Sequence, residues 1–356
     1  MLFRSLELKL GYLFAGRQIV HLAGLKRIDE RAIDWMTGGA GVVTVNALLD
    51  RVGLVPSEVL PSLQKYGLPL EGKIGWERLA QVKDFFKDPS VQTSVLKVAA
   101  QRRAEVRAYF MDCGLIDGDP CAVVDIGWRG SVLRSIFDII GAESAAKHQF
   151  LYFGLYGRPA DAPEARMIPF CFDASGPQPV GSASRVPSLM AVMEIFCQAD
   201  HPQVLHVAKQ GNAFVPILRQ APADTPATWW DIKYFQDCME AFADAVAIDV
   251  APNPDADLRL LCENLLQCLM SHPTRDEARV LGSIQYVDDQ SGTTSQPFAV
   301  PFRLVDARAA LRSGHPPQKT LTWWEQGAWE LTSGPVRRVL DMACWLGRRR
   351  GVRPQG

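Results

Sequence analysis

The pattern of hydrophobic and polar positions is most regular near the middle of the chain. An apolar run at residues 121–126 is followed by apolar residues at helical spacing over 131–140, and then by a second apolar run at 149–157. A strand, a helix and a strand in so short a span form a βαβ unit, whose two strands must be parallel. The sequence therefore predicts an α/β protein with a parallel, Rossmann-like sheet that includes residues 122–126 and 150–155.

A different pattern fills the region before this unit. Between residues 42 and 113, apolar positions recur at spacings of three and four, and several prolines break the pattern into short helices. The most regular helix is expected over 93–113, with Gly114 as its C-terminal stop. Its buried stripe is predicted to leave out Val95 and to consist of Leu96, Ala99, Ala100, Val106 and Phe110. Residues 42–113 are therefore interpreted as a helical insertion.

The flanking segments complete the predicted architecture. A strand over 12–15 is expected to join the sheet and to lead into helical spacing over 17–36. A further strand near 165–173, a helix near 188–200 and a hairpin that turns at Gly211-Asn212 are also expected. From residue 229 the pattern is mainly helical, with a break at residues 251–257. We expect a first domain over 1–220 and a mainly helical C-terminal region over 221–356 that ends in a basic tail.

The segment VVDIGWRGS at the first strand–helix junction carries the densest set of candidate binding residues. Ligands of open α/β sheets bind beyond the carboxyl ends of the strands, where an acid is expected here. Glycines let the backbone approach a ligand, and a helix start offers free N–H groups and a positive dipole end. An arginine adds a fork suited to phosphate or carboxylate. The candidate ligand-binding set is Asp125, Gly127, Trp128, Arg129, Gly130 and Ser131.

The same residues also fit a tight βα turn, in which the glycines serve the backbone, Ser131 caps the helix and Trp128 packs. Two further positions extend the candidate site. Arg17 opens a helix after the predicted strand at 12–15 and is expected to converge with Arg129 if the two strands are neighbours. Glu194, on the helix near 188–200, is a second candidate ligand-binding residue. The carboxylate of Asp125 is also suited to hydrated Mg²⁺, the one cofactor that the sequence suggests.

Composition narrows the classes of function. The net charge of −1 gives no overall field that would attract nucleic acid. The eight cysteines form no CxxC pair and are expected to be buried reduced thiols, which favours the cytoplasm. The start is a poor signal peptide, and no window reaches the ~20 apolar residues of a membrane span. The arginine-rich C-terminus, with Trp345, predicts weak peripheral contact with an anionic membrane.

Five segments together resemble a known family. They are YLFAGRQIVHLAGLKRIDERAIDWM, VVDIGWRGSVLRSI, FLYFGLYG, VMEIFCQADHPQVL and HPTRDEARVLG. The set is similar to the C-terminal region of predicted hydrolases of the haloacid dehalogenase (HAD) superfamily that are associated with bacterial surface-polysaccharide biosynthesis. The resemblance implies a module that binds a phosphorylated sugar or a nucleotide-sugar in cell-envelope polysaccharide synthesis, in the cytoplasm or at the inner face of the membrane.

The chain departs from that family near its start. Family members look as if they begin with a HAD domain bearing an aspartate pair, and a FLARDG-like strand usually precedes the segment that starts here at Tyr12; neither is found. Gly16 stands where relatives often have serine. Since the aspartyl nucleophile is missing, hydrolase activity is not implied and enzymatic function stays open.

Three alternatives to the ligand-binding module therefore remain. The first is an interaction module that docks on a separate HAD enzyme or a glycosyltransferase. The second is a phosphoribosyltransferase-like enzyme, because an acid, a glycine-bearing loop and a serine at a helix start are similar to the phosphate loop of that family. This chain has the single acid Asp125 where that loop has two. The third is an inactive fragment with an exposed sheet edge.

Overall fold

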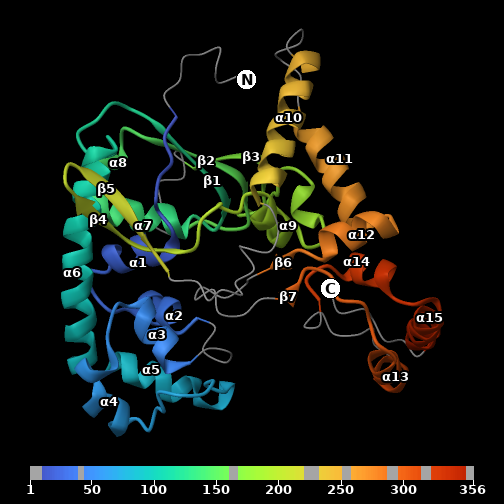
Figure 1. The fold of residues 1–356 in the computed structure, drawn as a ribbon, viewed down its shortest axis with the longest axis horizontal. Helices are drawn as coiled ribbons and strands as arrows, with labels where there is room; N and C mark the ends of the chain where they lie inside the picture. Colours follow the sequence, from blue (N-terminus) through green and yellow to red (C-terminus); the bar gives the residue numbers. More distant parts are fainter. Residues whose placement is uncertain are drawn as a thin grey trace. The chain divides into compact units, whose positions relative to one another are not determined.

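A computed structural model describes residues 10–38, 44–159, 167–219, 232–250, 258–286, 296–313 and 322–349 (Figure 1). The chain forms two compact units. The first contains Met1–Pro169, Ala199–Thr225 and Val287–Thr294, and the second contains Phe170–Gln198, Pro226–Tyr286 and Ser295–Gly356. Neither unit is one continuous stretch. The predicted division at residue 220 stays a prediction, because residues 220–231 lie outside those that the structure describes.

The first unit combines helices with a small sheet. Its helices are α1 (Arg17–Gly24), α2 (Glu30–Thr37), α3 (Val45–Arg51), α4 (Leu60–Lys65), α5 (Leu79–Lys87), α6 (Pro89–Asp112), α7 (Ser131–Ile140) and α8 (Ala142–Ala145), with short 3-10 turns at Pro56–Glu58 and Trp76–Arg78. Its strands are β1 (Ala122–Trp128), β2 (Gln149–Leu155) and the antiparallel hairpin of β4 (Val204–Gln210) and β5 (Ala213–Leu218). The hairpin turns at Gly211, as predicted, with a φ of +62°.

The predicted βαβ unit is confirmed. β1 and β2 pair in parallel, with Ala122 opposite Gln149 and Trp128 opposite Leu155, and α7 connects them. β3 (Met167–Asp173), also predicted, completes a three-stranded parallel sheet of order β1-β2-β3. The inward face of α7 is apolar at helical spacing, which explains why this helix packs on the sheet. The chain is therefore a mixed α/β protein.

The strand predicted over residues 12–15 is wrong. Residues 10–16 have no regular secondary structure. The backbone N–H of Phe14 donates to the Tyr109 hydroxyl at 2.9 Å, and the Phe14 ring packs against Tyr109 at 6.4 Å between centroids. The hydroxyl of Tyr12 bonds Nε2 of His201 at 3.1 Å. The apolar alternation of this segment therefore reflects aromatic packing and side-chain hydrogen bonds, and not a sheet ladder.

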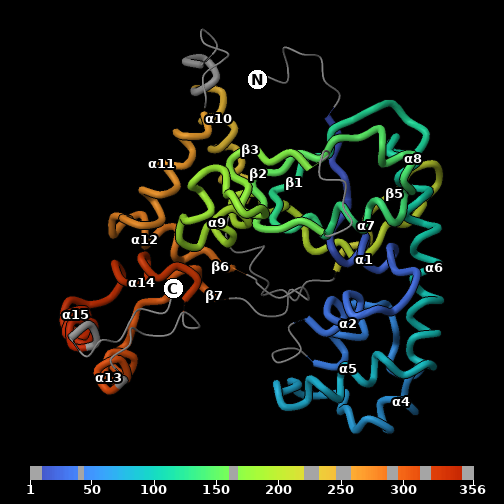
Figure 2. Tube along the Cα trace, turned by 180° about the vertical axis from the view of Figure 1, so that it is seen from behind, coloured from blue at the N-terminus to red at the C-terminus, as the bar shows by residue number. Residues whose placement is uncertain are grey.

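The described residues of the first unit form two hydrophobic cores. One is built from α2 to α5 with the first half of α6, and we call this region the helical lobe. The other is built mainly from α7, β2, β4 and the second half of α6, with Val123 of β1 packed against it, and we call it the sheet lobe. Helix α1 gives Leu22 to the first core and Ile19, Val20 and Ala23 to the second. Figure 2 shows the long α6 running alongside both lobes. The helical character predicted for residues 42–113 is confirmed, but its core begins earlier, at Leu22.

Helix α6 was predicted correctly in kind and position, but not in its buried stripe. It begins at Pro89 after Asp88, whose side chain accepts from the N–H of Ser90 and caps the helix. Val95, expected to face outward, is 1% exposed, whereas Ala100 is exposed and Leu96 is half-buried. The buried positions run Val91, Val95, Ala99 and then Val106, Tyr109 and Phe110. The stripe changes its path along the helix because the two halves face different cores.

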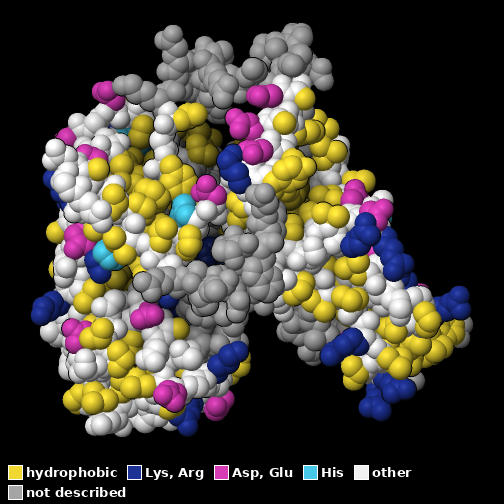
Figure 3. Space-filling view, viewed as in Figure 1, with side chains coloured by type: hydrophobic (Ala, Val, Ile, Leu, Met, Phe, Trp, Pro, Cys, Tyr) yellow, Lys and Arg dark blue, Asp and Glu magenta, His cyan; other side chains and the backbone are white. Residues whose placement is uncertain are grey.

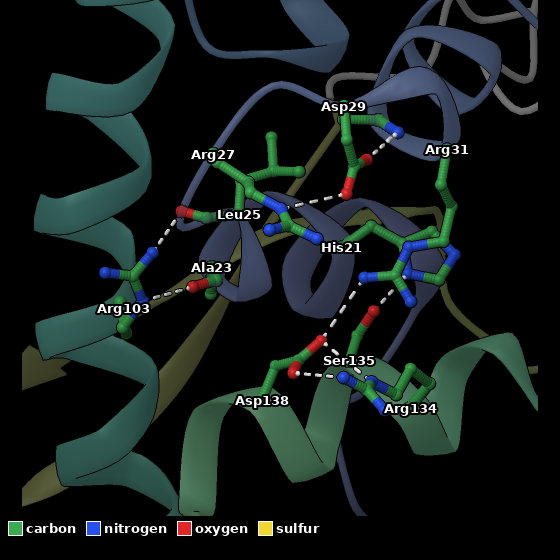
Figure 4. A network of polar contacts seen from close by, with 11 residues as sticks. His21, Ala23, Leu25, Arg27, Asp29, Arg31, Arg103, Arg134, Ser135 and Asp138 are labelled. Atoms are coloured by element: carbon green, nitrogen blue, oxygen red, sulfur yellow. Dashed lines mark hydrogen bonds and ion pairs between the residues drawn. The ribbon is translucent and has the colours of Figure 1, made fainter. Parts of the chain in front are cut away.

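A polar joint lies where α1 meets α2, α6 and α7 (Figure 4). Nδ1 of His21 lies 2.7 Å from the Ser135 hydroxyl, and the His21 ring meets Trp35 edge-on at 5.5 Å. The Arg103 guanidinium donates to the carbonyls of Ala23 and Leu25 at the end of α1. Burial lowers the pKa of His21 to about 3, and the nearby Arg17 and Arg31 charges add to this. His21 is therefore neutral at physiological pH.

The second unit is mainly helical. It contains α9 (Leu189–Phe196), α10 (Ile232–Val250), α11 (Leu258–Ser271), α12 (Arg275–Gly282), α13 (Leu304–Ser313), α14 (Glu325–Leu331) and α15 (Gly334–Arg349), a 3-10 turn at Ala183–Arg185 and the short pair β6 (Gln285–Tyr286) and β7 (Gln296–Pro297). The helix predicted near 188–200 is α9. Trp324 is fully buried, stacks on Phe298 and donates from its indole N–H to the Met270 carbonyl at 2.9 Å. The break predicted after α10 lies in residues 251–257, outside the described part.

Candidate functional site

The start of α7 is the centre of the candidate site. Gly130 is the N-cap and adopts the left-handed conformation, with φ +64°, and no side chain of the described residues caps the helix. The prediction that Ser131 is the cap is wrong, because Ser131 is the first helical residue. Ser131 and Arg129 are both exposed. An uncapped helix start directs N–H groups and a positive dipole end toward whatever lies in front of it.

The two glycines of the loop are required by the protein itself. A Cβ on Gly127, whose φ is +126°, would lie 2.1 Å from the carbonyl oxygen of Gly154 on the paired strand. A Cβ on Gly130 would lie 2.2 Å from Cε of Met167 and 3.2 Å from Pro159. Both positions thus need glycine for close backbone approach and for positive φ. The alternative explanation of a tight βα turn accounts for the glycines without any ligand.

The prediction that Asp125 stands at the end of a strand is wrong. β1 continues to Trp128, and Asp125 lies in its middle, opposite Tyr152 on β2. Its side chain is half-buried, and one carboxylate oxygen accepts a long hydrogen bond, 3.5 Å, from the N–H of Gly127. Burial raises the pKa of the Tyr152 hydroxyl, and the Asp125 charge raises it further. Asp125 therefore lies behind the loop, three residues back from the strand end.

Trp128 serves packing. Its indole is 3% exposed and lies against the rings of Phe153, at 6.4 Å, and Tyr156, at 5.8 Å. Its carbonyl accepts from the N–H groups of Tyr156, at 2.7 Å, and Gly157, at 3.2 Å. These bonds tie the turn after β2 to the end of β1. Trp128 therefore helps to fix the shape of the loop, and ligand contact by its ring stays a prediction.

This turn brings a residue to the site that the sequence analysis did not identify. Arg158 follows β2 and donates to the Met167 carbonyl at 3.1 Å. Its positive charge lowers the pKa of the Tyr152 hydroxyl, whereas the negative charge of Asp125 raises it. Gly157 lies beside the aliphatic stem of Arg129, since a Cβ on Gly157 would be 3.9 Å from Cγ of Arg129. The carboxyl ends of β1 and β2 therefore carry one arginine each. The Gly-Arg pair directly after a predicted strand was the signal that could have found Arg158.

Arg17 occupies the first position of α1 and is exposed. α1 packs on α7 through His21 and Ser135, one helical turn beyond Arg17. Arg17 was expected to converge with Arg129 if a strand at residues 12–15 neighboured β1. Residues 12–15 form no strand, so this condition is not met. Convergence of Arg17 with Asp125 and Arg129 stays a prediction.

Glu194 lies on α9, which belongs to the second unit, whereas the other candidates belong to the first unit. One of its carboxylate oxygens accepts a hydrogen bond of 2.5 Å from the hydroxyl of Tyr286. This bond ties α9 to β6 within the second unit. It supports a structural role, and ligand binding by Glu194 stays a prediction.

The predicted Mg²⁺ has a limited set of protein ligands. Among the residues that the structure describes, no three His, Cys, Asp or Glu side chains gather as a metal site. Asp125 would be the one carboxylate ligand, and a Mg²⁺ ion held in this way takes its other ligands from phosphate and water. The metal therefore stays a prediction that depends on a phosphorylated ligand.

The structure bears on the predictions made for the cysteines and for membrane spans. None of the eight cysteines is in a disulfide, which agrees with reduced thiols. Their predicted burial is wrong for most, since Cys171 alone is buried and five are exposed. Within the described ranges, no helix combines the length and the apolar character that a bilayer span requires.

Comparison with models of known protein families gives no match, and comparison with curated proteins gives none either. The resemblance to the C-terminal region of HAD-superfamily proteins of polysaccharide biosynthesis therefore stays an expectation.

Proposed function

We propose that the carboxyl ends of β1 and β2 bind the phosphate group of a phosphorylated sugar or a nucleotide-sugar, in cell-envelope polysaccharide synthesis. The observation that carries the proposal is the uncapped start of α7 with Arg129 before it, and Arg158 on the adjacent strand end. Helix N–H groups and guanidinium groups are the donors that proteins use for phosphate. Asp125, behind the loop, is suited to a sugar hydroxyl or to a metal held by the phosphate.

The test is titration calorimetry of the pure protein with UDP-glucose, glucose 1-phosphate and inorganic phosphate. We expect Arg129→Gln and Arg158→Gln each to weaken binding about ten- to hundredfold, because each removes a charge-assisted hydrogen bond worth roughly 1.5–3 kcal/mol. Arg27→Gln is the matched control, since its side chain is 84% exposed and lies on another loop. Gly130→Val is unsuitable, because its side chain would clash with Met167. Absence of heat with every probe, with and without Mg²⁺, would contradict the proposal.

A non-catalytic interaction module is the second candidate, and one observation favours it. Helices α10 and α11 expose large apolar side chains, among them Tyr234 at 68%, Phe242 at 65%, Leu260 at 64% and Leu265 at 54%. Hydrophobic side chains gather over this pair of helices in Figure 3. Exposed apolar patches of this kind are typical of protein–protein contacts. The expected partner is a separate HAD enzyme or a glycosyltransferase. Phe242→Ser would then weaken partner binding and leave calorimetric ligand binding unchanged.

We also propose weak contact with the inner membrane face through α13 and α15. These helices pack together and expose Leu304, Val305, Met342 and Trp345, with Arg308, Arg312 and Arg338 exposed beside them. Basic groups near an anionic surface contribute about 1 kcal/mol each, and the interaction falls with salt. Liposome flotation should show binding to anionic vesicles that Arg308→Gln/Arg338→Gln reduces. Equal binding to neutral vesicles would contradict it. The arginines of the basic tail from residue 350 onward lie outside the described residues.

A further inference from the structure

The parallel pairing of β1 and β2 brings a cysteine and a histidine together at the amino ends of the strands. Ala122 lies opposite Gln149, so the residues directly before them, Cys121 and His148, are neighbours although 27 positions apart. Sγ of Cys121 lies 3.2 Å from Nδ1 of His148. No local sequence motif marks this pair, because the register of the two strands alone brings the residues together. It lies at the opposite end of the strands from the proposed phosphate site.

His148 is held in one orientation and one tautomer. Its side chain is fully buried, and Nε2 lies 3.0 Å from the carbonyl oxygen of Leu115. A carbonyl only accepts, so Nε2 carries the proton. The backbone N–H of Cys121 donates to Nδ1 at 3.3 Å, which requires an unprotonated Nδ1. The imidazole therefore presents a basic lone pair toward the Cys121 sulfur, and a third group orients the ring, as in activated cysteine nucleophiles.

Cys121 combines this base with access from solvent. The residue is exposed, and its backbone is fixed on both sides, since its carbonyl also accepts from the N–H of Gln149 at 3.0 Å. Partial burial raises the pKa of the Cys121 thiol, so the resting form is S–H and not thiolate. The reaction of this thiol thus depends on proton removal during attack. The hydrogen bond from the backbone N–H of Cys121 to Nδ1 is longer than the usual 2.9–3.0 Å. Little hydrogen-bond energy is therefore lost when Nδ1 takes a proton.

We propose that Cys121 is a thiol–disulfide exchange site with His148 as its general base. The Cys121 sulfur attacks one sulfur of a low-molecular-weight disulfide while its proton moves to Nδ1 of His148. The disulfide S–S bond breaks, a new S–S bond joins Cys121 to one half, and the other half leaves as a thiolate that takes the proton from His148. The products are a mixed disulfide and a free thiol, so no further oxidant is needed.

The first experiment uses the native full-length protein and oxidised glutathione. The occupancy of each cysteine is followed over time by mass spectrometry of peptides. We expect Cys121 to form the mixed disulfide at least about tenfold faster than Cys268, an exposed cysteine on α11, because a positioned base contributes about 10²–10⁴ in rate. Equal rates at the two cysteines would overturn the proposal, whatever the variant below shows.

The second experiment compares the wild type with His148→Gln, which has no basic nitrogen. If His148 is the base, the rate at Cys121 falls at least about tenfold and the rate at Cys268 is unchanged. If His148 only covers the sulfur, its replacement opens access and Cys121 reacts faster, which would overturn the proposal. Labelling of Cys171, which is 3% exposed, reports unfolding of the variant. In that case the wild-type comparison of Cys121 with Cys268 decides alone.

Discussion

The core of the helical lobe and the polar joint around His21 lie next to each other in the first unit, yet they stabilise it by different means. The core is aliphatic and aromatic, with Phe85 and Phe86 each 1% exposed. The joint connects α1 to α7 and α6 through the polar contacts of His21 and Arg103, and the ion pair of Arg31 with Asp138 connects α2 to α7. The hydrophobic effect is non-directional and does not depend on pH. The polar contacts of the joint require a particular geometry, and their contribution to stability depends on pH. The comparison shows that the position of α1 against α7 depends on groups that can titrate.

The largest effect is expected in the core. Phe86→Ala should lower the free energy of unfolding by about 3–5 kcal/mol, because it removes a buried ring and leaves a cavity. The loss should be equal at pH 5 and pH 7, measured by urea denaturation. Val55→Ala, at a side chain that is 54% exposed, is the control and should change little. A loss that differs strongly between the two pH values would break the distinction between core and joint.

A smaller, pH-dependent effect is expected at the joint. The pKa of His21 is about 3 in the folded protein and ordinarily 6.5, so between these values the unfolded chain binds a proton that the folded chain does not. Stability is therefore lost as pH falls from 6.5 toward 3, and about 2 kcal/mol of it between pH 7 and pH 5. Urea denaturation at a series of pH values measures this slope.

Two variants separate His21 from other titrating groups. His21→Asn should flatten the slope between pH 5 and 6.5, because the group that gains a proton on unfolding is gone. His272→Asn is the matched control, since His272 is exposed and its replacement should leave the slope as it is. An unchanged slope in His21→Asn would show that the joint does not hold a buried neutral histidine.

Much of the sheet lobe could be predicted because its signals are local. The apolar runs of β1 and β2 and the helical spacing of α7 each lie within about ten residues, and so does the Gly211-Asn212 hairpin. The predictions failed where contacts with residues distant in the sequence determine the local structure. Tyr109, 95 positions away, satisfies the backbone of Phe14 in place of a sheet. Val95 is buried because α6 faces two cores, which no single helical stripe describes.

The candidate site could be predicted in position but not in detail. The strand–loop–helix sequence located the loop at residues 125–131, and the structure places Arg129 and Ser131 exposed there. The length of β1 could not be inferred, so Asp125 was placed at a strand end that lies three residues further on. Arg158 and the Cys121–His148 pair depend on strand register, which is set by pairing across the sheet and leaves no local pattern.

The length of α6 has a consequence for how the first unit opens. A helix of 24 residues is about 36 Å long, and here Val91, Val95 and Ala99 sit in one core while Val106, Tyr109 and Phe110 sit in the other. Helix α6 is therefore a structural element common to both cores. Excision of residues 42–113 would remove Val106, Tyr109 and Phe110 from the core of the sheet lobe, so the insertion is not a removable module. Amide hydrogens in both halves of α6 should exchange in the same cooperative opening, since neither half can leave its core without strain on the other.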